Sequence, residues 1–135
     1  MNAARTSRKS VDAEHWHGRL TSAKSYLKAA RDRLTLADEG ANCAPAVSLV
    51  VTAAIAYADS VTAKRALTVN QRDRSTAAQL LRDVLGRELP DRQERFLRRI
   101  LGAKDEAQYG TRHIPKSEAM GHLESLQAFA HWAEE

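Results

Sequence analysis

A cluster of arginines is the strongest chemical signal in this sequence, and its members are Arg92, Arg95, Arg98 and Arg99. In a helix, Arg92, Arg95 and Arg99 are three and four residues apart and share one face, with Arg98 beside it. Guanidinium groups form forked hydrogen bonds to phosphate, so this face can bind a phosphate backbone. Asp91 and Glu94 offset part of the charge. The alternatives are a solvated face with internal ion pairs, or arginines that pair with carboxylates across a dimer interface.

The histidines give less indication of chemistry. His15 and His17 point in different directions on a helix, and His113, His122 and His131 belong to separate segments. The sequence has no phosphate-binding glycine loop, no serine-centred elbow and no His and Cys cluster with metal-ligand spacing. We therefore expect no metal site and no cofactor.

Composition sets the broad class of the protein. A chain of 135 residues fits one domain with a real core, and its 21 basic and 17 acidic residues give a net charge of +4. This mild basic bias is compatible with nucleic-acid binding but does not require it. The single Cys43 excludes an internal disulfide, and no signal peptide is visible. We expect a cytoplasmic protein.

Residues 44–67 form the stretch around which the rest of the chain is expected to pack. Small or apolar side chains cover nearly every face of this stretch between residues 46 and 58, so other helices must surround it. Alanines such as Ala53 allow close approach, while Ile55 and its neighbours supply apolar area. The run is too interrupted for a membrane span and ends at Asp59, so we expect a soluble core helix and no membrane association.

Apolar residues at helical spacing predict further helices on both sides of this core helix. The expected helices cover residues 11–37 with Ser10 as N-cap, residues 76–85, a segment from residue 91 that continues past Gly102 to Gln108, and a last segment from Ser117. Capping-box patterns at Thr76 with Gln79 and at Asp91 with Glu94 mark two of the starts. No strand is expected. The sequence predicts an all-α protein, an antiparallel bundle of four to five helices.

The domain organisation is expected to be simple. Residues 1–9 are small, polar and basic and show no periodicity, which predicts a flexible arm that stays solvated or contacts phosphate. Residues 10–135 are expected to form a single helical-bundle domain.

Two segments carry a resemblance to a known family: AAIAYADSVTA (residues 53–63) and RRILGAKDEAQYG (residues 98–110), which a loop and one amphipathic helix follow. This order is similar to the HEPN superfamily of helical nucleotide-binding and ribonuclease-like domains. The later helix in that family often ends in Arg-x-x-Ala-Asp-Tyr, and the matching positions here are Lys104, Ala107, Gln108 and Tyr109. Lys104 thus stands in place of the usual Arg, and Gln108 in place of the usual Asp.

The resemblance implies a binding module more than a nuclease. Ribonuclease members carry an Arg-x(4–6)-His motif near the end of this helix, and no residue between Arg98 and Tyr109 supplies the His. The implied protein is a non-catalytic homodimer that binds RNA or a nucleotide, or accompanies a nucleotidyltransferase or toxin partner. Arg95, Arg98, Arg99 and Lys104 would hold phosphate, and Tyr109 would stack on or orient the ligand.

Two alternatives stay open. In the first, the chain is a metal-independent ribonuclease in which His113 acts as general acid or base beside Arg99 or Arg112, because a His with a pKa near neutrality suits proton transfer. In the second, it is a helical homodimeric interaction protein with no nucleic-acid ligand, and its arginines only solvate the surface or bridge subunits.

Overall fold

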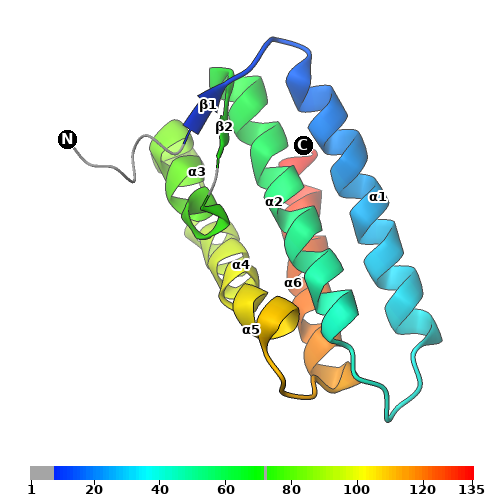
Figure 1. The fold of residues 1–135 in the computed structure, drawn as a ribbon. Helices are drawn as coiled ribbons and strands as arrows, with labels where there is room; N and C mark the ends of the chain where they lie inside the picture. The colour runs from blue at the N-terminus through cyan, green and yellow to red at the C-terminus, as the bar shows by residue number, and fades with distance from the viewer. Residues whose placement is uncertain (1–7, 72) are drawn as a thin grey trace.

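The computed structural model describes residues 8–71 and 73–135, which form an antiparallel bundle of helices (Figure 1). The long helices are α1 (His15–Leu36), α2 (Ala44–Ala66) and α6 (Lys116–Ala133). The shorter ones are α3 (Ala77–Leu85), α4 (Asp91–Gly102) and α5 (Lys104–Tyr109), with 3₁₀ turns η2 (Arg74–Thr76) and η3 (Gly86–Glu88) before and after α3. The all-α bundle predicted from the sequence is confirmed.

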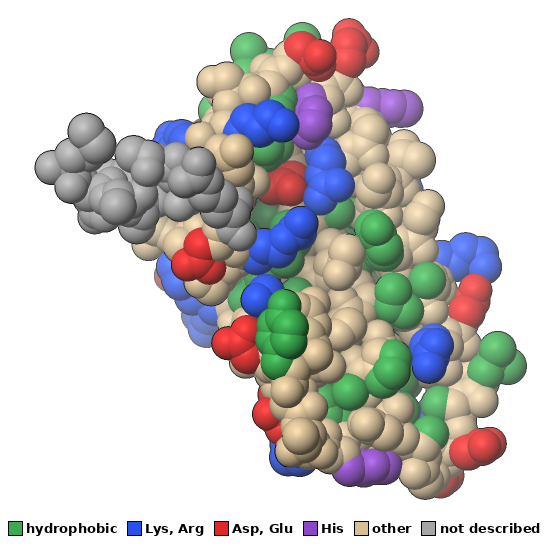
Figure 2. Space-filling view, viewed as in Figure 1, with side chains coloured by type: hydrophobic (Ala, Val, Ile, Leu, Met, Phe, Trp, Pro, Cys, Tyr) green, Lys and Arg blue, Asp and Glu red, His purple; other side chains and the backbone are tan. Residues whose placement is uncertain are grey.

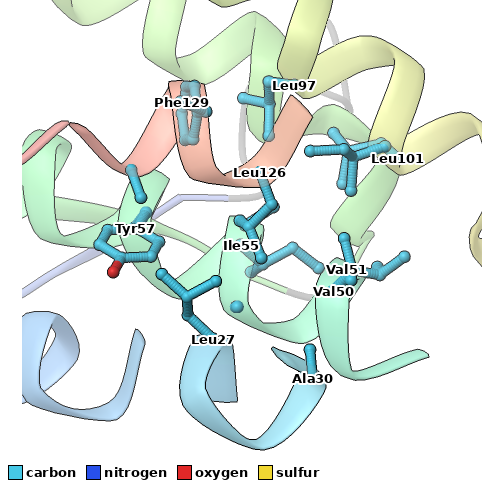
Figure 3. Packing of buried hydrophobic residues seen from close by; sticks show 14 of the residues in the cluster. Leu27, Ala30, Val50, Val51, Ile55, Tyr57, Leu97, Leu101, Leu126 and Phe129 are labelled. Atoms are coloured by element: carbon cyan, nitrogen blue, oxygen red, sulfur yellow. The ribbon is translucent and has the colours of Figure 1, made fainter. Parts of the chain in front are cut away.

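Helix α2 is the centre of the bundle, as its composition predicts. It packs against α1, α3, α4, α5 and α6, and Val50, Val51 and Tyr57 have no exposed surface. Figure 3 shows side chains of α1, α4 and α6, among them Leu27, Leu97 and Phe129, converging on this helix. The alanines of α2 permit these close approaches because they add almost no side-chain volume.

A short antiparallel ribbon contradicts the expectation that the chain has no strand. β1 (Arg8–Ser10) pairs with β2 (Thr68–Asn70), with Lys9 opposite Val69, at the end of the bundle where α1 begins and α2 ends (Figure 1). The cause is Leu67, whose left-handed backbone (φ 52°) ends α2 and turns the chain into an extended segment. The backbone groups of that segment need partners, and residues 8–10 supply them.

The ribbon also corrects two sequence-based boundaries. Arg8 and Lys9 belong to the fold and not to the predicted arm, whose remaining residues 1–7 lie outside the described residues. Ser10 is part of β1, so it does not cap a helix starting at residue 11, and α1 begins only at His15.

The predicted capping boxes are not formed. The Thr76 hydroxyl donates to the carbonyl oxygen of Asp73 at 2.7 Å and caps no helix N–H, and α3 begins at Ala77. Asp91 is the first residue of α4, whose N-cap is Pro90 without a side-chain bond. In both cases a tertiary or local contact takes the side chain that the pattern assigned to the cap.

The continuous helix expected through Gly102 is interrupted. α4 ends at Gly102, Ala103 forms a turn, and α5 starts as a separate short helix that packs mainly against α2. Gly110 follows the last residue of α5, and its N–H donates to the carbonyls of Asp105 and Glu106. A Cβ at this glycine would lie 2.7 Å from the Glu106 carbonyl oxygen, so the close turn requires glycine.

Helix α2 is long and apolar enough, by length and composition, to cross a membrane. In the bundle, however, 78% of its most apolar window is buried. Burial of this kind is expected for a helix at the centre of a bundle.

Candidate functional site

The arginine cluster of the sequence lies on the outer side of α4. The inner side of this helix is formed by Leu97, Ile100 and Leu101, all buried, while Arg92, Arg95, Arg98 and Arg99 are exposed. Arg98 donates to the carboxylate of Glu94 at 2.8 Å. Among the described residues, the other three arginines form no ion pair, so they present uncompensated positive charge to solvent.

Arg82 is a basic residue that sequence reasoning missed and that organises the start of α4. Its guanidinium donates to the carboxylates of Glu94 and Asp91 and to the carbonyl oxygens of Gly86 and Leu89. Hydrogen bonds from Arg98 and Arg82 lower the pKa of the Glu94 carboxyl, which therefore stays ionised at neutral pH. The two acidic residues of α4 thus balance Arg82 and Arg98 and leave the remaining arginines free.

A cleft between α2, η2 and α5 gathers three of the four positions at which the family motif was matched, Lys104, Gln108 and Tyr109. Its lining residues are Thr52 and Ile55 of α2, Asp73 and Arg74 at η2, and Lys104, Gln108 and Tyr109 of α5. We call it the Lys104 cleft; its volume is about 350 Å³. The face of the molecule seen in Figure 2 carries several separate Lys and Arg side chains among apolar and uncharged ones. The break at Ala103 turns α5 toward α2 and so forms one wall of the cleft.

The polar groups of the Lys104 cleft are arranged around a cation and an aromatic ring. The Lys104 ammonium lies 5.6 Å from the centre of the Tyr109 ring and 3.4 Å from a carboxylate oxygen of the exposed Asp105. Hydrogen bonds from the side chain and N–H of Ser75 lower the pKa of Asp73, so this carboxylate is ionised. Arg74 and Lys104 supply two positive charges, Asp73 supplies one negative charge, and Tyr109 offers an exposed ring face.

A neighbouring hollow lengthens the Lys104 cleft along α2. It shares Thr52 and Gln108 with the cleft, has a volume of about 640 Å³, and is lined further along by Ser48, Asn42 and Arg33. Together the two hollows form a groove that begins at Arg74 and ends at Arg33.

A buried carboxylate holds the turn that carries Arg74. Asp59 of α2 is 7% exposed and accepts hydrogen bonds from Arg19 (3.2 Å) and from the N–H of Asn70 (3.4 Å). The side chain of Asn70 in turn donates to the carbonyl oxygen of Asp73. A charged residue in an otherwise apolar helix was the available sequence signal for this connection, because a buried carboxylate requires partners.

The residues of the predicted ribonuclease alternative are not joined to one another. Arg112 donates to the carboxylates of Glu118 and Glu106, while His113 is exposed and makes no hydrogen bond to Arg99 or Arg112. The charge of Arg99 instead acts on His122 of α6, whose pKa is lowered first by burial. No group of three or more His, Cys, Asp or Glu side chains in residues 8–71 and 73–135 is placed to hold a metal ion.

Comparisons with known proteins add no relative. No protein-family model, curated protein or solved structure matched this chain.

Proposed function

We propose that this chain is a non-catalytic, HEPN-like module that binds RNA or a nucleotide through its phosphate groups. The observation that carries the proposal is the Lys104 cleft, in which Lys104, Arg74 and Tyr109 line one cavity. A phosphate would lie between the two cations, and a base would stack on the exposed ring of Tyr109. The negative charge of Asp73 would repel a second anionic group of the ligand at this end of the cleft.

Two further features support an extended, single-stranded ligand. The groove continues along α2 to Arg33, so a strand anchored at Lys104 has a path across the face. The exposed Arg92, Arg95 and Arg99 of α4 give the molecule a second cationic surface, as expected for non-specific phosphate contacts. Stacking and phosphate contacts of this kind tolerate any base sequence.

The test is fluorescence anisotropy with a labelled single-stranded RNA oligomer over a range of salt concentrations. Each phosphate contact contributes about −0.7 to the slope of log affinity against log salt. We expect Lys104→Gln and Arg74→Gln each to flatten the parental slope by about that amount, and Arg95→Ala or Arg99→Ala to do so if the strand also crosses α4. Tyr109→Ala is expected to weaken binding about tenfold and to leave the slope unchanged, because stacking releases no counterions.

Lys28→Gln is the matched control. Lys28 is exposed on α1 and is paired with Asp32, so this variant also loses one positive charge but lies outside the groove. If Lys28→Gln and Lys104→Gln change the affinity equally, only net charge matters and the cleft is not the site. If no RNA or nucleotide binds at low salt, the helical interaction protein with no nucleic-acid ligand is the better description.

Homodimer formation is part of the same proposal. It follows from the resemblance to HEPN domains, as does association with a nucleotidyltransferase or a toxin partner. Size-exclusion chromatography with light scattering at tens of micromolar should give twice the mass of the chain. A monomeric mass at that concentration would remove the homodimer from the proposal without affecting the cleft.

The ribonuclease alternative receives less support from the geometry. Arg112 is held by two carboxylates, which neutralise the charge that a catalytic arginine would direct at phosphate. Incubation of the protein with structured and unstructured RNA in EDTA is expected to leave the RNA intact. Cleavage that disappears in His113→Ala would instead favour a metal-independent ribonuclease.

A further inference from the structure

A second cavity lies at the end of the bundle where α1 begins and α2 and α6 end. It has a volume of about 380 Å³ and shares no lining residue with the Lys104 cleft. Its apolar lining consists of Trp16 and Leu20 of α1, Val61 of α2, Leu85 of α3, and Trp132 and Ala133 of α6. Because these residues come from four different helices, the cavity is formed only by the assembled bundle. We call it the tryptophan cavity.

The two indole rings give this cavity its character. The chain has two tryptophans, and both line the tryptophan cavity, where Trp16 and Trp132 are half-buried. Trp132 packs against the buried ring of Phe129, with ring centres 5.6 Å apart. Half-buried indoles that face an open cavity leave flat apolar surface for a ligand to cover.

Several of the charged groups at the rim already have a partner. Arg65 is paired with Glu88 at 2.6 Å, and Glu134 accepts a hydrogen bond from Tyr57 and lies 3.7 Å from Lys24. Glu135 also lines the cavity, with a carboxylate oxygen 3.7 Å from the imidazole of His131. The Lys64 ammonium has no carboxylate partner among the described residues and rests over the ring of Trp16, 4.6 Å from its centre.

We propose that the tryptophan cavity binds a small organic anion with a flat apolar body. The anionic group, a carboxylate or a sulfonate, pairs with the ammonium of Lys64, and the body lies against the indoles of Trp16 and Trp132. Lys64 is held at the ring by its cation–π contact, so it is already in position and little side-chain freedom is lost on binding. Glu88 and Glu134 already have donors, so they offer no comparable site for an organic cation.

The experiment uses the two indole N–H signals in proton–nitrogen correlation spectra of the 135-residue chain. Naphthoate is the probe, and naphthylmethanol and naphthylmethylammonium are its neutral and cationic analogues. We expect both indole signals to shift saturably with one dissociation constant for naphthoate, with weaker binding of the alcohol and none of the ammonium compound. Trp16→Phe assigns the two signals.

Lys64→Gln is expected to weaken naphthoate binding about tenfold while binding of the alcohol stays as in the parent. Lys28→Gln, which removes the same charge elsewhere on the surface, should leave the dissociation constant unchanged. The proposal is overturned if the indole signals do not move at millimolar naphthoate, if the three analogues bind equally, or if Lys64→Gln keeps the parental affinity. None of these outcomes depends on RNA binding at the Lys104 cleft.

Discussion

Arg19 on α1 donates a hydrogen bond of 3.2 Å to the carboxylate of Asp59, a residue that lies on the apolar core helix α2. The carboxylate is nearly buried, and burial raises its pKa above the ordinary aspartate value even though Arg19 and the N–H of Asn70 oppose that shift. The effect of burial on the pKa is therefore larger than the opposing effect of the ion pair. The pair exists because a buried carboxylate without a donor would be costlier still.

The raised pKa of Asp59 predicts a pH dependence of stability. Because the folded state binds this proton more tightly than the unfolded state does, the free energy of unfolding falls as pH rises from about 4 through the raised pKa. Asp59→Asn lacks this titration. Denaturant unfolding followed by circular dichroism should show the parent losing stability relative to Asp59→Asn as the pH rises, with no further change above the raised pKa.

The opposite trend would have a definite meaning. If the parent gained stability relative to Asp59→Asn with rising pH, the Arg19 ion pair would outweigh burial, and the pKa of Asp59 would be lowered. Arg19→Gln is the second variant, because it removes the attraction and should make the pH-dependent loss larger.

Tyr57 predicts a modest cost for losing one hydroxyl. Its ring is fully buried, and its hydroxyl donates to the Glu134 carboxylate at 2.9 Å. Tyr57→Phe keeps the packing and removes the bond, and the partly exposed Glu134 returns to water, so we expect a loss of about 1 kcal/mol of unfolding free energy. Glu134→Gln retains an acceptor and should cost less. A loss well above that of ordinary hydrogen bonds would mean that the hydroxyl satisfies a second buried group.

Leu67 predicts a stabilising substitution. It adopts the left-handed region (φ 52°, ψ 40°) at the end of α2 and is 48% exposed, so it bears backbone strain and buries limited apolar area. Leu67→Gly should raise the free energy of unfolding by about 1 kcal/mol. Ala66→Gly, one residue earlier within the helix, should lower it by about 0.5–1 kcal/mol. Destabilisation by Leu67→Gly would show that packing of the side chain outweighs the strain.

Apolar periodicity is enough to predict the helical architecture of this chain. The apolar stretch of α2 and the spacing of Leu97, Ile100 and Leu101 were sufficient to predict a helical bundle with α2 at its centre. The ribbon of β1 and β2 was not predictable, because it depends on a left-handed Leu67, and leucine carries no signal for that conformation. The helix break at Ala103 was equally hidden, since Gly102 permits either a continuous helix or an interruption.

Sequence reasoning named some residues of the candidate site and missed others. The family resemblance named Lys104 and Tyr109, but they are five residues apart on one short helix, a spacing that does not put them on one face, so their common place in a cleft was not predictable from it. Arg74 reaches the same cleft from a 3₁₀ turn thirty residues earlier in the chain, and only the tertiary fold brings it there. Arg82 was missed because its partners lie across the turn between α3 and α4.

The small residues of α2 carry the last prediction. Ala54 has no exposed surface and lies in the core between the helices that surround α2, so a larger side chain there has no space. Ala54→Leu should lower the free energy of unfolding by about 1–3 kcal/mol, because added methylenes push packed helices apart. Ala29→Leu is the matched control: Ala29 is exposed on α1, and leucine is nearly as good a helix former, so the stability should change little. Urea unfolding of both variants measures the difference. Equal stabilities would mean that the bundle repacks around α2, and that close approach at alanine does not fix the distances between its helices.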